Sequence, residues 1–404
     1  MFIAHIYGVK IPESISRIFP KTDRKILSRK LKSECLRVIV DSWDGEFIYA
    51  NGEDSEVDIL KVNYTHTGLY NNGNWSYIRD LLYKDAQLNL IRPRQEGEVL
   101  FPELIIFEPD YLVDVSSVAR CFAPYAESSF VNLVKRIEPA KTTEEIVMGN
   151  LAGQLLDEAI HQLPNTHSYA QSVIDFFKNN ALNLLDINPG PQFHNDAKMQ
   201  KQNIQRALSD GMRNENFRNF DSKDGLVEPS FFSEMLGIQG RMDYLQYDFK
   251  FLIEQKSGKG DFPYENFIRP RHKEEHYVQL LLYMLLIRYN FRDVFEHNGQ
   301  DLRAFLLYSK YQNSLDGLGF APDLIFRALK IRNEIAWTDM LYTQPNGYRI
   351  LDDLTPDKLN MKHLHGRLWD DFLKPQLTEL LEPIHKASDL EKGDTCKLPW
   401  HNVT

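Results

Sequence analysis

The chain has 404 residues and a net charge of −10, and hydrophobic residues make up 43% of it. This length allows roughly two or three domains with a sizeable core. The sequence lacks a run of about 18 apolar residues that could cross a bilayer, and residues 1–15 lack the pattern of a signal peptide. We therefore expect a cytoplasmic protein with no membrane partner. The acidic balance argues against a surface that binds nucleic acid throughout, but it leaves room for a locally basic channel.

Residues 1–110 are predicted to form a β-rich N-terminal domain. Short runs rich in β-branched and aromatic residues alternate with clusters of Gly, Asp, Asn and Glu. These runs are LRVIVDSW, EFIYAN, VDILKVNY and ELIIF. A small barrel or sandwich fits this pattern best. The basic segment from Lys21 to Lys32 is typical of a solvated helix face, with a DNA contact as the alternative.

Residues 111–340 are predicted to form an α/β domain, because helical spacing and short strands alternate there. The predicted helices cover about 142–163, 168–183, 196–216, 273–289 and 322–340, and the predicted strands cover about 236–247, 250–257 and 305–310. Residues 341–404 are predicted to form a mostly helical C-terminal extension.

The segment 237–260, GIQGRMDYLQYDFKFLIEQKSGKG, is the one that suggests chemistry. A hairpin with its turn near Asp248 and Phe249 places Asp243 opposite Glu254, with Cβ atoms ~4.5–5.5 Å apart. Strand alternation puts Lys256 on the same face as Glu254. The alternative is an exposed hairpin that carries an ordinary charge pair.

Two carboxylates and an ammonium on one sheet face suit phosphodiester cleavage. Mg²⁺ or Mn²⁺ would relieve the repulsion between Asp243 and Glu254 through oxygen ligands, and the Gln255 carbonyl could add another. Such a cation lowers the pKa of bound water. Lys256 could orient that water or stabilise charge on the phosphate.

Three segments together resemble successive motifs of the RecB-type exonuclease family: GRMD (240–243), EQKSG (254–258) and QLLLY (279–283). The resemblance implies a restriction-endonuclease-like PD-(D/E)XK core, in which a mixed central sheet is flanked by helices. It also implies metal binding by Asp243 and Glu254, catalysis by Lys256, and substrate contact by Gln279 and Tyr283.

The predicted helix supports this interpretation independently. His276, Gln279 and Tyr283 lie at positions i, i+3 and i+7 and so share one face of an otherwise apolar helix. We expect this face to contact the nucleic acid, with a satisfied hydrogen bond in the core as the alternative. In the loop after the hairpin, Lys259 and neighbouring basic residues could line a phosphate path, although interleaved acidic residues also fit a solvated loop.

A closer resemblance is to the nuclease module of the helicase–nucleases that trim Okazaki-fragment flaps. It rests on residues 104–122, 276–287 and 328–337, and the β-rich start is similar to the N-terminal barrel of those proteins. It implies single-stranded DNA or flaps as substrate, in replication, repair or recombination. It also implies a helicase in the same chain or as a separate partner.

Two departures from the family pattern matter. Relatives carry a metal-binding His in a Gly-x-x-x-His setting, whereas Gly149 is followed here by Gly153. Asp157 lies one helical turn further on and could replace that ligand, with an ordinary surface charge as the alternative. Glu228 is an acidic residue that could lie near the site or be purely structural.

Many relatives also hold an iron–sulfur cluster with four cysteines. This chain has three, Cys35, Cys121 and Cys396, so neither such a cluster nor a disulfide framework is expected. The rival interpretations are a catalytically silent nucleic-acid-binding subunit, and a nuclease of a CRISPR-adaptation or phage-defence system.

Overall fold

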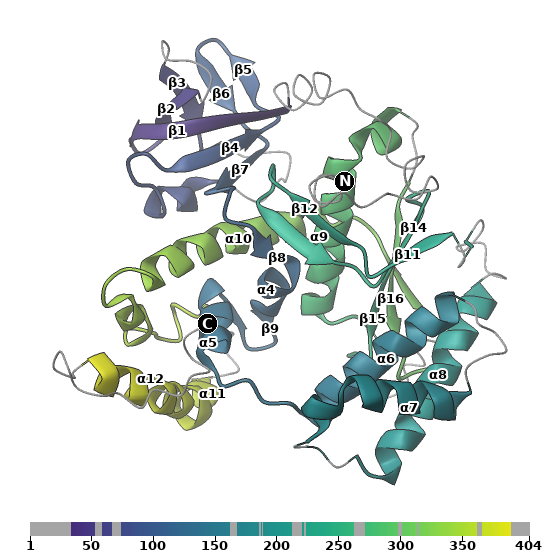
Figure 1. Ribbon diagram of the computed structural model, residues 1–404. Helices are drawn as coiled ribbons and strands as arrows, with labels where there is room; N and C mark the ends of the chain where they lie inside the picture. Colours follow the sequence, from purple (N-terminus) through teal and green to yellow (C-terminus); the bar gives the residue numbers. More distant parts are fainter. Residues whose placement is uncertain are drawn as a thin grey trace, which may run out of the picture.

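The computed structural model describes residues 34–52, 59–66, 74–161, 168–185, 187, 189–211, 220–221, 224–261, 271–297, 301–312, 315–361 and 366–388. The basic segment from Lys21 to Lys32 and Cys396 lie outside these described residues. The fold is mixed α/β, as the alternation of patterns predicted (Figure 1).

The β-rich region forms one seven-stranded sheet in the order β5-β6-β3-β2-β1-β4-β7. Its strands are β1 (Cys35–Trp43), β2 (Phe47–Gly52), β3 (Ile59–Asn63), β4 (Gln87–Ile91), β5 (Arg94–Glu96), β6 (Val99–Phe101) and β7 (Leu104–Phe107). Neighbouring strands are antiparallel except β3 and β6. Among the described residues the order runs from an edge at β5 to an edge at β7, so the sheet is open. The pairings thus do not confirm a closed barrel.

Helix α10 (Pro322–Tyr342) fastens this sheet to the rest of the chain. The fully buried Arg332 donates to the carbonyls of Phe107 and, at 3.0 Å, of Gly237. Gly237 has a φ of +59°, and the Arg332 guanidinium occupies the space that a Cβ would need. Asn333 adds bonds to the Phe107 N–H and the Ile105 carbonyl. One helix therefore ties the sheet edge to the Gly237 turn.

A second sheet forms the centre of the remaining chain, in the order β11-β14-β15-β16-β17. Its strands are β11 (Gly225–Val227), β14 (Tyr244–Gln246), β15 (Phe251–Lys256), β16 (Arg303–Tyr308) and β17 (Leu315–Leu318). Strands β15 and β16 are parallel, and the other neighbours are antiparallel. A mixed sheet was predicted for this region.

Helices cover both faces of this sheet (Figure 1). On one side α6 (Glu144–Ile160), α7 (Tyr169–Asn179) and α8 (Pro191–Gly211) enclose a core that includes Phe251 and Ile253. On the other side α9 (Glu274–Asn290) packs over Leu245 and Leu252. Residues 280–287 of α9 are all buried, which explains why its sequence is apolar on nearly every face. The sheet thus lies between two layers of helix.

A small third sheet joins the two larger ones. It contains β12 (Ser230–Ser233), β13 (Ile238–Arg241) and β8 (Val113–Asp114), and it leads into α4 (Val115–Arg120). The predicted continuous strand 236–247 is therefore wrong: it breaks at Met242 and Asp243, and its halves β13 and β14 belong to different sheets.

Most of the described C-terminal residues are helical, as predicted, and they pack against α5 (Ser129–Ile137). They form η5 (Gly347–Leu351), α11 (Gly366–Leu368), η7 (Trp369–Leu373) and α12 (Lys374–Ser388). None of the helices in the described part of the chain has the length and apolar character needed to span a membrane.

Candidate active site

The predicted hairpin register is confirmed. Strands β14 and β15 pair Tyr244 with Ile253 and Leu245 with Leu252. The same register, extended by one residue, places Asp243 opposite Glu254. The Asp243 Oδ2 accepts a hydrogen bond of 2.6 Å from the Gln255 N–H, so this carboxylate lies against the end of β15.

Asp243 lies at a corner where two neighbouring strands change sheets together. The chain leaves β11 and enters β12 at Glu228 and Pro229, and it leaves β13 and enters β14 at Met242 and Asp243. Backbone bonds brace the corner, from the Glu228 N–H to the Asp243 carbonyl at 3.0 Å and from the Met242 N–H to the Pro229 carbonyl at 3.1 Å. The corner supplies a fixed backbone for the Asp243 side chain.

The α9 face holds the other two predicted catalytic residues. Lys256 Nζ donates to Glu254 Oε1 at 2.9 Å and to Gln279 Oε1 at 2.6 Å. The Gln279 amide nitrogen donates in turn to Glu254 Oε1 at 2.8 Å. The structure thus brings Glu254, Lys256 and Gln279 into one network.

Glu254 and Asp243 are neighbouring carboxylates, of which Glu254 is buried and Asp243 is half-buried. Glu254 is 3% exposed, and its Oε2 has no hydrogen-bond partner among the described residues. Burial, and then repulsion from Glu254, hold the pKa of Asp243 well above its ordinary value, against the opposing effects of Lys256 and the Gln255 N–H. An orphaned buried oxygen beside a second carboxylate is the environment that a hard cation would satisfy.

The donor set fits Mg²⁺ or Mn²⁺ through these two carboxylates. Within the described residues, no group of three or more His, Cys, Asp and Glu is arranged to hold a metal. A cation at Asp243 and Glu254 would therefore depend on water and backbone oxygens for its other ligands. Mg²⁺ suits this arrangement, because it retains several waters and often uses only one or two carboxylates.

A cavity of about 250 Å³ opens beside Asp243. Three of its lining residues are lysines, namely Lys256, Lys259 and Lys273. Its remaining lining residues are Gly149, Gly153, Gln255, Ser257, Gly258 and His276. A Cβ at Gly153 would meet nothing within 4 Å, so this wall of α6 leaves the cavity open. The cavity therefore combines an acidic group with several cationic ones.

Asp157 is not among the residues that line this cavity. Burial, and then the charge of Glu228, raise its pKa to about 7, and its own charge contributes to the raised pKa of Asp243. Glu228 pairs with Arg241 at 3.2 Å on the strand before the corner. Asp157 thus acts electrostatically on Asp243, and Glu228 acts on Asp157. Direct metal binding by Asp157 stays a prediction.

The other residues of the predicted substrate face differ in exposure. Tyr283 is 2% exposed, and its hydroxyl donates to the Arg241 carbonyl at 2.7 Å, so its ring has no open face for a base. His276 lines the cavity and contacts the Tyr308 hydroxyl at 2.9 Å. Burial, and then Lys256, lower the pKa of His276 to about 3, which keeps its ring neutral. Of this face, His276 lies at the cavity, whereas Tyr283 supports the strand that leads to Asp243.

The sequence analysis missed the residues behind β15. Gln200 and Asn203 of α8 and Ser309 after β16 are all buried and hydrogen-bonded around the end of that strand. Their spacing carries no signal, because Gln and Asn in a polar helix are usually exposed.

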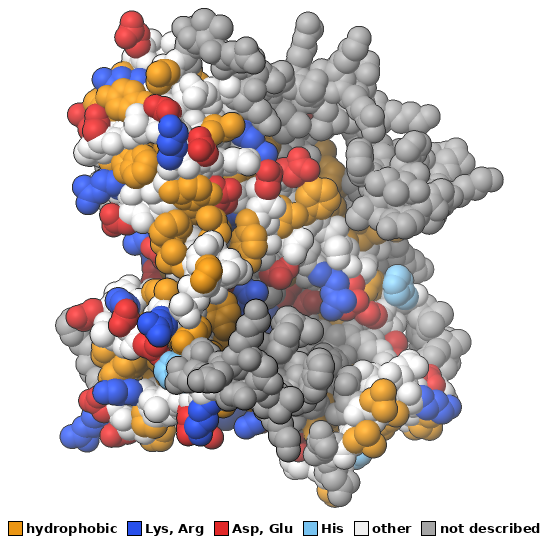
Figure 2. All heavy atoms as spheres, turned by 60° about the vertical axis from the view of Figure 1, so that its left-hand side comes forward, with side chains coloured by type: hydrophobic (Ala, Val, Ile, Leu, Met, Phe, Trp, Pro, Cys, Tyr) orange, Lys and Arg blue, Asp and Glu red, His pale blue; other side chains and the backbone are white. Residues whose placement is uncertain are grey.

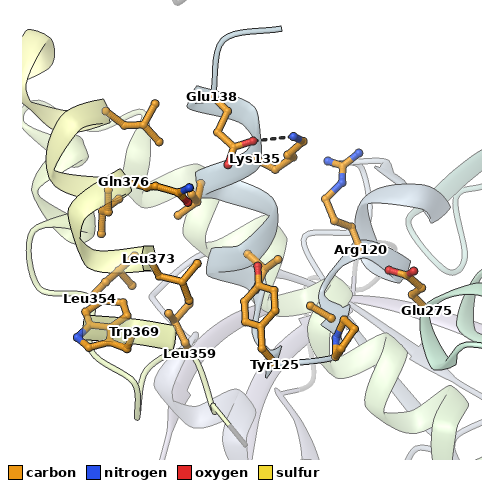
Figure 3. Close-up of a pocket in the computed structure, with 16 residues that line it drawn as sticks. Arg120, Tyr125, Lys135, Glu138, Glu275, Leu354, Leu359, Trp369, Leu373 and Gln376 are labelled. Atoms are coloured by element: carbon orange, nitrogen blue, oxygen red, sulfur yellow. Dashed lines mark hydrogen bonds and ion pairs between the residues drawn. The ribbon is translucent and has the colours of Figure 1, made fainter. Parts of the chain in front are cut away.

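A second cavity, of about 280 Å³, lies between α5 and the C-terminal helices (Figure 3). Leu354, Trp369 and Leu373 form an apolar wall there, and Lys135 and Glu138 pair at 2.6 Å on its rim. Its wall is apolar and two of its charged residues pair with each other, whereas the first cavity brings three lysines to Asp243. The chemistry is therefore expected at Asp243.

Comparisons with known proteins add little to this geometry. No protein-family model matches the chain, and no curated protein matches its sequence. One solved structure that it resembles is a protein from Eubacterium rectale that is provisionally named an exonuclease. The likeness covers 60% of this chain and 81% of the other, at 14% identity and a TM-score of 0.34. A similarity this weak carries no argument about fold or function.

Proposed function

We propose that the chain is a Mg²⁺- or Mn²⁺-dependent nuclease that hydrolyses phosphodiester bonds of DNA, with a PD-(D/E)XK core at about residues 111–340. The observation that supports this most directly is the buried Glu254 Oε2, which has no partner among the described residues and lies beside a second carboxylate. An isolated buried carboxylate oxygen is costly. A cation bound there during the reaction would give this oxygen the partner that it lacks in the metal-free protein.

Each residue then has a distinct task. Asp243 and Glu254 would hold the cation, with the Gln255 carbonyl and water as further ligands. The cation, when bound, lowers the pKa of a water and polarises the phosphoryl oxygen. Lys256 is held by Glu254 and Gln279 at the cavity, where its ammonium can stabilise charge that develops on the phosphate.

The lysines of the cavity support a phosphate-bearing substrate. Lys259 and Lys273 lie in the same cavity as Lys256, so cationic groups are available beyond the reacting phosphate. Figure 2 shows a different picture on the face that carries the β-rich sheet, where basic and acidic side chains are interspersed. We therefore propose that DNA contacts the chain at the cavity. The preference for single strands or flaps rests on the resemblance to helicase–nucleases, as does a helicase partner.

The test uses labelled single- and double-stranded DNA with Mg²⁺, Mn²⁺ or EDTA. The parent protein should cleave only with metal, and Glu254→Ala and Lys256→Ala should stay folded yet lose cleavage. Lys250→Ala is the matched control for Lys256→Ala, because Lys250 lies on the same hairpin but pairs with Asp248 at 2.7 Å at the turn. Full activity in folded Glu254→Ala protein would refute the assignment. Metal-independent binding of DNA without cleavage would instead favour the silent-subunit alternative.

A further inference from the structure

Three buried polar side chains lie behind the strand that carries Lys256. Gln200 and Asn203 come from α8, and Ser309 follows β16 directly. Gln200 is 2% exposed and Ser309 is fully buried. Polar groups in such a place destabilise the fold unless each has a partner, so their bonds show what they hold.

The bonds form a closed ring around the backbone of Lys256. The Gln255 amide nitrogen donates to Ser309 Oγ at 3.1 Å, and Ser309 Oγ donates to Gln200 Oε1 at 2.6 Å. The Gln200 amide nitrogen then donates to the Ser257 carbonyl at 3.3 Å. The ring leaves the main chain at residue 255 and rejoins it at residue 257, so the backbone of Lys256 is part of the ring.

Further bonds fix the ring to its surroundings. The Ser309 N–H donates to the Lys256 carbonyl at 3.1 Å, in continuation of the β15–β16 ladder. Asn203 donates to the Ser309 carbonyl at 3.0 Å. Ser309 is therefore held from α8 and from β15 together, and its hydroxyl has both an acceptor and a donor.

Successive side chains of a strand point to opposite faces, so Gln255 and Lys256 point to different sides of β15. Gln255 points to the α8 side and enters the ring, whereas Lys256 points to the α9 side and bonds Glu254 and Gln279. The side chain of Lys256 is thus fixed on the α9 side of β15, and its backbone is fixed from the α8 side. An apolar filling behind β15 would pack the same space without fixing this backbone.

We propose that Gln200 and Ser309 are positioning residues that hold Lys256 at the reacting phosphate. The role of Lys256 in this statement rests on the proposed nuclease function, whereas the positioning itself does not require activity. Misplacement of a reacting group by about 1 Å can lower a rate about a hundredfold. The ring therefore acts on turnover, and substrate affinity is set elsewhere in the cavity.

The first test measures position without activity. Lys256 of the parent protein should react slowly with an amine-acylating reagent followed by mass spectrometry, because both of its bonds restrain the ammonium. In Ser309→Ala the Lys256 labelling rate, relative to Lys259 in the same protein, should rise about threefold or more. Ser172→Ala is the matched control: this hydroxyl of α7 is also fully buried and donates to Glu158 at 2.5 Å. It should leave the labelling ratio unchanged.

The second test measures turnover on saturating and limiting DNA. Ser309→Ala should lower kcat about tenfold or more with KM nearly unchanged, whereas Ser172→Ala should keep both values. Thermal unfolding compares the stability cost of the same hydroxyl deletion at the two sites. If Ser309→Ala does not fold, Gln200→Met opens the ring at another corner with nearly the same volume and should give the same two results.

The outcomes separate the two proposals. If no protein cleaves any substrate with either metal, the nuclease function fails, and the labelling ratio alone decides on positioning. A Ser309→Ala protein whose labelling ratio and kcat match those of Ser172→Ala would overturn the positioning role. A raised KM at unchanged kcat would overturn it equally, because it would show an effect on substrate binding.

Discussion

Asp243→Asn should stabilise the metal-free protein while it abolishes cleavage. The substitution removes one of two neighbouring carboxylate charges, that of the half-buried Asp243, and keeps an oxygen that can accept the Gln255 N–H bond. Charges ~5 Å apart repel by about 3 kcal/mol at an effective dielectric constant of ~20. Lost attraction to Lys256 offsets part of this gain, so we expect about 1–2 kcal/mol and a melting temperature higher by a few degrees.

The stability that Asp243→Asn adds to the metal-free protein should depend on pH in a defined direction. The folded pKa of Asp243 lies above its unfolded value, so the fold favours the protonated acid. Its contribution to wild-type stability is complete below the unfolded pKa of about 3.9 and is lost as the pH rises through the raised folded pKa. The advantage of the Asn variant over the parent, measured in EDTA by thermal unfolding, should therefore grow as the pH rises through that range.

Mg²⁺ or Mn²⁺ should reverse the difference in thermal stability between the parent and Asp243→Asn. A ligand at ten times its Kd stabilises the folded state by about 1.4 kcal/mol, and the variant lacks one of the two carboxylates that would hold it. The melting temperature of the parent should thus rise with Mg²⁺ or Mn²⁺ more than that of Asp243→Asn. Asp110→Asn, which alters an exposed carboxylate paired with Arg37, serves as the control and should show neither effect. A variant that is less stable than the parent in EDTA, yet gains equally from metal, would refute the reasoning.

Three further predictions concern residues around the site. Tyr283→Phe removes the bond to the Arg241 carbonyl and should lower kcat and cost about 1–2 kcal/mol of stability; a raised KM at unchanged kcat would show instead that this residue contacts DNA. The parent should lose stability as the pH rises through about 7, and Asp157→Asn should reduce this loss. If Asp157 also binds metal, the variant should need more metal for cleavage, and Gly153→His should partly compensate. A metal titration that matches that of the parent would exclude metal binding by Asp157. Protein purified without oxygen should be colourless and iron-poor, because an iron–sulfur cluster usually needs four thiolate ligands and the chain has three cysteines; stoichiometric iron with a visible charge-transfer band would contradict this.

The local geometry of the β14–β15 hairpin could be predicted because several signals agree there. Its turn residues and its alternating pattern admit one register that buries Leu245 and Leu252 on one face and Ile253 on the other. A shift by one residue would reverse these faces. The pairing of Asp243 with Glu254 follows from that register alone.

The burial of Tyr283 and of Gln200 could not be predicted in the same way. Helical spacing shows which residues share a face but not whether that face meets solvent or another element. Tyr283 lies under β13, where Gly240 leaves room for its ring: a Cβ there would be 2.7 Å from it. Gln200 lies behind β15. Both positions depend on tertiary packing, which a single helical pattern does not encode.

The corner at Asp243 also has no signal in a period-two pattern, yet it explains how the site is built. A straight strand through residues 238–246 would keep β13 and β14 in one sheet, whereas the break lets β13 pair with β8 and β14 with β15. Asp243 is therefore held by the backbone bonds of the corner, Glu254 by α9, and Lys256 from both faces of β15. Because each group is fixed independently, the two carboxylates cannot separate to relieve their repulsion. The rigidity that would place them for the proposed cation also makes the metal-free site electrostatically unfavourable.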